Sequence, residues 1–236
     1  MFLLRAPMGG NKKGTISQNT ASTYFSILKA GLKQAFVDEY LTVDIGAKVK
    51  GITNIEKPRV ALSMNEVQML VDTPCKDDVL KRAFLFSILT GLRHSDIQTL
   101  KWKQIQQTSK GTWQAVIVQQ KTKRPDYKPV IQQALQLCGE RPNDEESLVF
   151  EGLTDASWIS RPLKVWIEAS GIKKHITFHC GRHSFASLLL ENGVDIYTIK
   201  DLMGHTNVRT TQIYTHIVNE QKEKAANTLH IENLTL

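Results

Sequence analysis

The sequence predicts a mainly helical protein with one small antiparallel β-sheet, an α+β fold. Through most of the chain, apolar residues recur every three to four positions and capping residues flank the runs, as in amphipathic helices. Alternating β-forming residues are confined to residues 113–131. The 236 residues, 41% of them hydrophobic, suffice for one large domain or two small ones with proper cores.

The formal charge of +7 is concentrated at the N-terminal end of the chain. Residues 1–59 carry nine Lys and Arg against four Asp and Glu, whereas residues 60–236 carry 21 against 19. A basic segment attached to a nearly neutral body is typical of a DNA-binding arm, although the composition also fits a generally basic soluble protein. We therefore expect a domain boundary near residue 59.

The composition indicates a cytoplasmic protein. The sequence contains no run of about 18 apolar residues that could cross a membrane, and the apolar start 1–4 is too short for a signal peptide. Cys75, Cys138 and Cys180 are odd in number and are not spaced as a disulfide framework, which indicates a reducing compartment.

One helix, or a pair of helices, is predicted in the N-terminal region. Residues 1–14 contain Gly and Pro and predict an unstructured start. Residues 15–40 carry apolar side chains at helical spacing with lysines on the other side. Within this helix, the hydroxyl groups of Thr20 and Thr23 could meet DNA phosphates.

Residues 43–59 are predicted to form a basic linker. Glycines and a proline interrupt regular structure there, among four Lys and Arg side chains. Lys48 and Lys50 are therefore candidate phosphate contacts.

Five helices are predicted between residues 60 and 170 from capping residues and apolar spacing. They cover residues 63–71, 77–90, 94–102, 132–137 and 155–170. The second is almost wholly apolar and is expected at the centre of the core, with Gly91 ending it and Arg93 following. Alone, Arg93 would be an ordinary surface arginine after a turn.

Two strands are predicted at 113–119 and 126–131, joined by a basic hairpin turn. The turn carries Lys121, Lys123 and Arg124, of which Lys123 and Arg124 are candidate DNA contacts. A lysine on such a hairpin can reach into the minor groove of DNA.

The C-terminal part predicts three short helices. Thr177 caps a helix that runs to Glu191, Asp195 caps another through Met203, and Asn207 is expected to cap a third that carries Tyr214. His179 and Arg182 lie on one face of the first helix near its N-terminus, where the backbone favours an anion. Together they could hold a phosphate.

Each of these residues has an ordinary alternative. His179 alone would be a partly buried histidine, Arg182 alone a surface or salt-bridge residue, and Tyr214 alone a half-buried aromatic. A zinc site is a sharper alternative, because His175, His179 and His183 recur every four residues. The segment lacks the glutamate base of a metalloprotease helix, which argues against that alternative.

Five motifs in a fixed order resemble the tyrosine recombinase (phage integrase) family. They are Thr90–Ile97 (TGLRHSDI), Gln120–Thr122 (QKT), His179–Ala186 (HCGRHSFA), Leu202–His205 (LMGH) and Thr211–His216 (TQIYTH). The resemblance covers residues 62–229. The motif sequences most resemble those of integrases from conjugative and mobilizable elements in Bacteroides-type bacteria.

The resemblance implies a domain organisation. Residues 60–236 would form the catalytic domain, and residues 1–59 part of the helical core-binding domain, the two closing around DNA as a clamp. That domain normally has about four helices, and two or three at most are found here, which suggests a truncated chain. The polar helix expected at 219–229 would dock on a neighbouring protomer within a tetramer on double-stranded attachment sites, with DNA-bending accessory proteins as further partners.

The resemblance also implies a mechanism that uses no metal or nucleotide cofactor. Arg93, Arg182 and His205 would stabilise the phosphate, and Tyr214 would attack it to form a 3′-phosphotyrosyl link. His179 would accept or position the tyrosine proton. Lys121 would be the general acid, with Lys123 as the competing candidate, and Asp96 would orient an arginine.

Two other functions remain open at this point. A type IB topoisomerase uses the same chemistry to relax DNA instead of exchanging strands. A DNA-binding module could keep the fold without activity, although the complete set of six residues argues against that reading.

Overall fold

The computed structural model describes residues 15–55, 59–118 and 125–214. The chain divides into two compact units, Met1–Lys57 and Pro58–Leu236. Within the described ranges, no helix combines the length and the hydrophobicity needed to span a membrane.

The first unit consists of a 20-residue helix α1 (Gln18–Val37) and one turn of helix α2 (Ile45–Lys48). After α2 the chain returns along α1, and α1 side chains donate hydrogen bonds to its carbonyl groups. Gln18 donates to Thr53 O at 2.7 Å, Ser22 to Ile52 O at 2.8 Å and Lys29 to Val49 O at 2.8 Å. Residues 43–55, predicted as a linker, are thus in large part a folded element, because the polar side chains of α1 satisfy their backbone.

The second unit contains the remaining elements in a regular order. They are α3 (Met64–Asp72), α4 (Asp78–Thr90), α5 (His94–Gln98), the 3-10 turn η2 (Trp102–Gln104), β1 (Ile105–Gln107), β2 (Trp113–Val118), β3 (Pro125–Val130), α6 (Gln132–Cys138), α7 (Ala156–Ala169), α8 (Phe178–Glu191), α9 (Ile196–Leu202) and α10 (Arg209–Gln212). The α+β class predicted from the sequence is confirmed.

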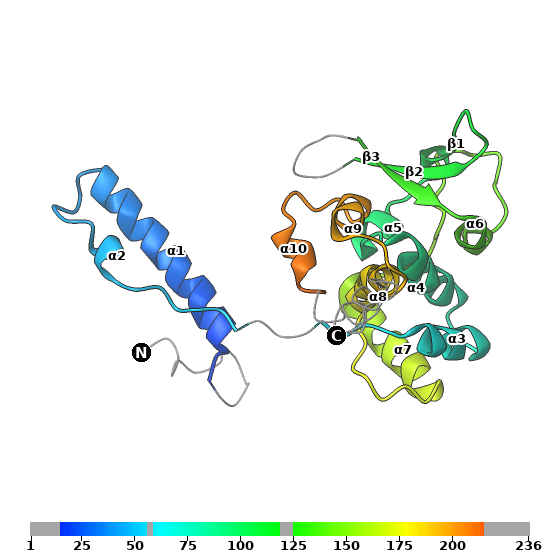
Figure 1. Cartoon of the computed structure of the whole chain (residues 1–236), viewed down its shortest axis with the longest axis horizontal. Helices are drawn as coiled ribbons and strands as arrows, with labels where there is room; N and C mark the ends of the chain where they lie inside the picture. Colours follow the sequence, from blue (N-terminus) through cyan, green and yellow to red (C-terminus); the bar gives the residue numbers. More distant parts are fainter. Residues whose placement is uncertain (1–14, 56–58, 119–124, 215–236) are drawn as a thin grey trace, which may run out of the picture. The chain divides into compact units, whose positions relative to one another are not determined.

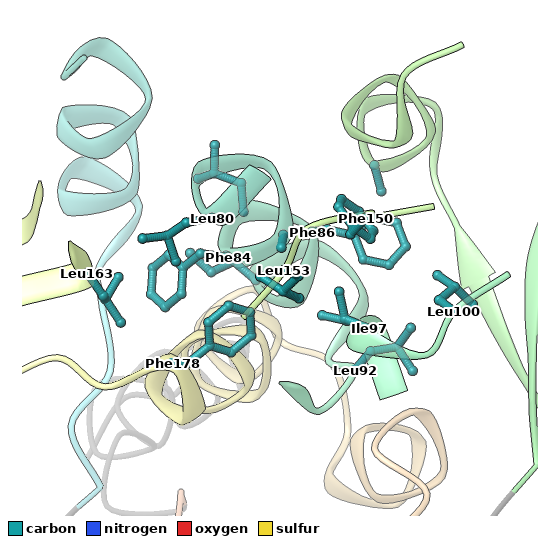
Figure 2. Packing of buried hydrophobic residues seen from close by; sticks show 14 of the residues in the cluster. Leu80, Phe84, Phe86, Leu92, Ile97, Leu100, Phe150, Leu153, Leu163 and Phe178 are labelled. Carbon is teal, nitrogen blue, oxygen red and sulfur yellow. The ribbon is translucent and has the colours of Figure 1, made fainter. Parts of the chain in front are cut away.

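Helix α4 is the centre of the second unit. It packs against α8 and α6, and α7 packs against α8 (Figure 1). The α4 residue Phe84 is fully buried and meets Trp166 of α7 and Phe178 of α8 edge to face, with ring centroids 6.0 and 5.5 Å apart. Figure 2 shows the rings of Phe84 and Phe178 side by side, and this packing fixes α8 and therefore the residues on it.

The ends of these helices follow the predicted caps. Ser63 and Glu66 form the capping box of α3, and the Asp77 side chain accepts from Leu80 N. Gly91 ends α4 in the left-handed conformation, with φ of 69°. An added Cβ at Gly91 would lie 2.5 Å from the Phe185 ring, so only glycine fits this turn.

The sheet has three antiparallel strands in the order β1-β2-β3. The predicted pair is confirmed, with Trp113 opposite Val130 and Val118 opposite Pro125. Strand β1 was not predicted, and its Ile105 pairs with Ala115 across a turn that contains Gly111. Three residues are too few to show an alternating pattern.

The helix predicted at 94–102 is shorter than expected. Helix α5 ends at Gln98, and the following backbone pairs with a distant segment: Trp102 N donates to Ser147 O at 3.1 Å and Val149 N to Leu100 O at 2.8 Å. Long-range backbone pairing replaces the next helical turn here.

Candidate active site

Arg182 is the most buried charged group of the candidate site, with 2% of its surface exposed. Its Nη1 donates to Gly91 O at 2.6 Å, and its Nη2 donates to Met203 O. The same Nη2 lies 3.1 Å from Nε2 of His205. The guanidinium group thus joins α8 to the ends of α4 and α9, so that helix packing sets its position.

His205 follows α9 and contacts two groups. Because Arg182 can only donate, Nε2 of His205 accepts, and Nδ1 then carries the proton and donates to Thr211 Oγ1 at 2.9 Å. Desolvation, with the charges of Arg182 and Arg93, lowers the pKa of His205 to about 4. The imidazole is therefore neutral at physiological pH.

Arg93 precedes α5 and keeps about half of its side chain exposed. Asp96 contacts Arg93 at two points. Its carboxylate accepts a hydrogen bond from the Arg93 backbone N at 3.3 Å and lies 3.8 Å from the Arg93 guanidinium group. Desolvation first, and then the charge of Arg93, lower the pKa of Arg182 to about 10. Two guanidinium groups, one fixed and one partly exposed, thus concentrate positive charge where an anion could bind.

His179 lies in the first turn of α8 and remains exposed. Desolvation and the nearby charges of Arg182, Arg59 and Arg93 lower its pKa. Its ring stands edge-on to His183 with centroids 4.5 Å apart. His179 is therefore close enough to the arginines for their charges to act on it.

Tyr214 is almost completely buried, and its hydroxyl group contacts His183. The Tyr214 Oη lies 2.5 Å from Nδ1 of His183, which is itself buried. Burial raises the pKa of Tyr214 to about 12, and burial with nearby cations lowers the pKa of His183 to about 3. The phenol therefore donates, and the neutral imidazole accepts.

Two features of this contact differ from the sequence reading. Tyr214 was expected on a helix capped by Asn207, but α10 ends at Gln212, so Tyr214 lies just beyond it. In the sequence, His183 was a candidate only for a zinc ligand. Its position four residues after His179, on the same face of α8, was the signal that could have placed it in the site.

Tyr214 belongs to a small apolar cluster separate from the main core. The other buried members are Ala186, Leu190, Ile199 and Met203. They come from α8, from α9 and from the residue after α9. This second cluster holds the C-terminal end of the site against α8.

A buried ion pair connects the sheet to α9. Lys128 of β3 is 3% exposed, and its Nζ lies 2.7 Å from the Asp126 carboxylate. It also donates to Asp201 O at 3.2 Å, in the last turn of α9. Desolvation lowers the pKa of Lys128, and its charge contributes to the lowered pKa of His205. The pair thus supports the end of α9, which precedes His205.

Asp126→Asn is expected to lower the free energy of unfolding by about 3 kcal/mol, because it leaves the Lys128 cation buried without its counter-charge. Urea denaturation measures the change. Glu146→Gln is the matched control: Glu146 pairs with Lys101 and Lys103 at 3.0 and 2.6 Å on the surface. That loss should cost much less, because water screens the exposed charges of this pair. Equal effects of the two variants would contradict the assignment of a buried pair.

The DNA-contact residues predicted in the first unit are either exposed or hydrogen-bonded to nearby residues. Lys48 and Lys50 are exposed. Thr20 bonds to the Ser17 hydroxyl at 2.8 Å, and Thr23 donates to Asn19 O at 3.0 Å. Thr23 would have to release this bond to donate to a phosphate.

Other predictions fall outside the described residues: Lys121, Lys123, Arg124, the start at 1–14 and the helix at 219–229. Among the residues that are described, no three His, Cys, Asp or Glu side chains lie together as metal ligands. Cys180 instead contacts Thr177 at the start of α8.

Two sequence similarities to known proteins cover most of the chain. The sequence profile of the phage integrase family matches residues 61–221. The tyrosine recombinase XerD of Listeria monocytogenes serotype 4b (strain F2365) is 30% identical over 235 residues, covering 92% of this chain and 76% of that protein.

Solved structures share the fold at lower identity. The XerH site-specific recombinase bound to difH substrate in a pre-cleavage complex gives a TM-score of 0.66 at 19% identity, covering 91% of this chain and 66% of that one. A lambda integrase tetramer bound to a Holliday junction gives 0.63 at 21% identity, covering 82% and 59%.

Proposed function

The chain belongs to the phage integrase family, and from this premise we propose that it is a tyrosine-type site-specific DNA recombinase. It cuts and rejoins DNA through a 3′-phosphotyrosyl intermediate. The observation that carries the proposal is the meeting of Arg182, His205, His183 and Tyr214, which come from three separate segments. An arginine fork, neutral imidazoles and a tyrosine hydroxyl are the groups that phosphodiester transfer without a metal requires.

The proposed roles follow from the chemistry of each group. Arg182 and Arg93 stabilise the negative charge that develops on the non-bridging oxygens, and His205 adds a hydrogen bond. Tyr214 attacks phosphorus, and the family resemblance alone assigns the acceptance or positioning of its proton to His179. Lys121 protonates the leaving 5′ oxygen. The 5′ hydroxyl of another strand then reverses the step and releases the tyrosine.

The proposed partner is double-stranded DNA. The recombinase structures with this fold include one bound to its DNA substrate and a tetramer on a Holliday junction. By analogy, this chain would act as a tetramer on its attachment sites, with exchange of C-terminal tails and help from DNA-bending proteins. Residues 1–59 would grip the duplex face opposite the catalytic domain 60–236, using Lys48 and Lys50. Action on bacterial DNA would place it in the cytoplasm.

A suicide substrate tests the function directly. This duplex carries attachment-site sequence with a nick beside the cleavage point, so that the covalent intermediate accumulates. The chain should form a protein–DNA adduct on a denaturing gel, and EDTA should not reduce it. DNA binding without any adduct would favour the inactive module instead. Relaxation of supercoiled plasmid, without exchange between two sites, would favour the topoisomerase.

The finer proposal is that the substrate sites belong to a mobile element of Bacteroides-type bacteria. It rests on the amino-acid sequences of the five motifs. The measurement compares recombination between the ends of such an element with recombination on the difH substrate of XerH. Exchange on the difH substrate alone would overturn the proposal.

A further inference from the structure

The contact between His183 and Tyr214 has a chemical meaning beyond packing. The 2.5 Å distance from Nδ1 to Oη is the closest approach described for the tyrosine hydroxyl. Since the phenol donates, the lone pair of His183 Nδ1 accepts its proton in the hydrogen bond, and Nε2 carries the ring proton. A neutral imidazole with its lone pair on a nucleophilic hydroxyl is the arrangement of a general base.

His179 is less well placed for this task. It lies four residues earlier on α8, is exposed, and has its ring edge-on to His183. No described hydrogen bond joins it to Tyr214, whereas His183 bonds directly to the hydroxyl group.

We propose that His183 receives the phenolic proton as Tyr214 attacks DNA; the inference rests on the proposed recombinase function. As the bond from Tyr214 Oη to phosphorus forms, the bond from phosphorus to the 5′ oxygen breaks. The phenolic proton passes to Nδ1 of His183, and the general acid gives a proton to the 5′ oxygen. Rejoining runs the same transfers in reverse, so His183 returns the proton to the tyrosine.

The surroundings make this transfer depend on bound DNA. The charged and titratable groups around His183 are His179 and Arg182 of α8, Arg59, His205 and Tyr214 itself. The cationic members disfavour an imidazolium ion in the free protein, so the proton stays on the phenol. A bound phosphodiester brings negative charge to the arginines and offsets this repulsion, and it does so most strongly as charge builds in the transition state.

Chemical rescue tests the proposal. His183→Ala should slow adduct formation on the suicide substrate by about 10²-fold or more. Millimolar imidazole should then raise the rate of the variant by about tenfold. The rescue should increase with pH as added imidazole loses its proton, because only the neutral form accepts. His179→Ala is the matched control, and imidazole should not rescue it.

Several results would overturn the proposal. These are cleavage by His183→Ala at close to the wild-type rate, or rescue of His179→Ala but not of His183→Ala. If His183→Ala does not fold, His183→Asn decides, because its amide keeps an acceptor near the Nδ1 position without being a base. Slow cleavage by a folded, DNA-binding His183→Asn supports proton transfer, and a wild-type rate reduces His183 to a positioning residue. Absence of an adduct from the wild-type chain itself would count against the recombinase function.

Discussion

Tyr214→Phe should form no covalent adduct with DNA under conditions in which the wild-type chain does so. The substitution removes only the hydroxyl oxygen, which is the proposed attacking atom, and water is not expected to replace it in a buried position. The loss should be at least about 10⁴-fold, the scale seen when an enzyme loses its nucleophile. The suicide substrate and a denaturing gel give the measurement.

The fold should survive this change at a modest cost. The phenylalanine ring of the variant would fill the same apolar cluster, but Nδ1 of His183 would lose its partner. We expect the free energy of unfolding to fall by about 1–3 kcal/mol and DNA binding to stay unchanged. Tyr197→Phe, at an exposed position of α9, is the control and should keep full cleavage. An adduct that persists in Tyr214→Phe would identify another nucleophile and leave Tyr214 as a core residue.

Arg182→Lys should reduce the single-turnover cleavage rate by about 10³-fold, although the positive charge is kept. The guanidinium group uses Nη1 on Gly91 O and Nη2 on Met203 O, and a lysine has one nitrogen in place of this fork. It cannot hold both carbonyl groups and also present donors to a phosphate. Rapid-quench measurement of adduct formation gives the rate.

The same substitution should also lower stability, since one of two buried carbonyl groups loses its donor. A loss of about 1–3 kcal/mol in the free energy of unfolding is expected. Arg161→Lys on the exposed surface of α7 serves as the control for both measurements. Cleavage by Arg182→Lys near the wild-type rate would mean that charge alone is required at this position.

Local signals in the sequence predicted the helices well. Ser63, Asp77 and Gly91 act on backbone groups within one helical turn, so these helix caps can be predicted without knowledge of the fold. The motif residues Arg182 and His205 are in contact as well, but this contact depends on the packing of α8 against α9.

Long-range contacts explain what the sequence did not reveal. The burial of Tyr214 depends on residues of α8 and α9 that meet it only in three dimensions. The folding of residues 49–55 along α1 depends on side chains that lie about 20 to 36 positions earlier in the chain. The burial of Lys128 was not evident from the sequence, in which it resembles an ordinary strand lysine. The alternation of side chains along a strand does place Asp126 on the same face of β3.

The separation of the two apolar clusters has a consequence for cooperativity. The main core surrounds α4, whereas the second cluster has five buried members and holds α9 and Tyr214. Fewer buried contacts mean a smaller free energy of local opening. Amide protons of α9 should therefore exchange with solvent through sub-global openings while those of α4 wait for global unfolding. The melting temperature, which reports the main core, can then stay constant while the fraction of molecules with Tyr214 packed in the second cluster changes.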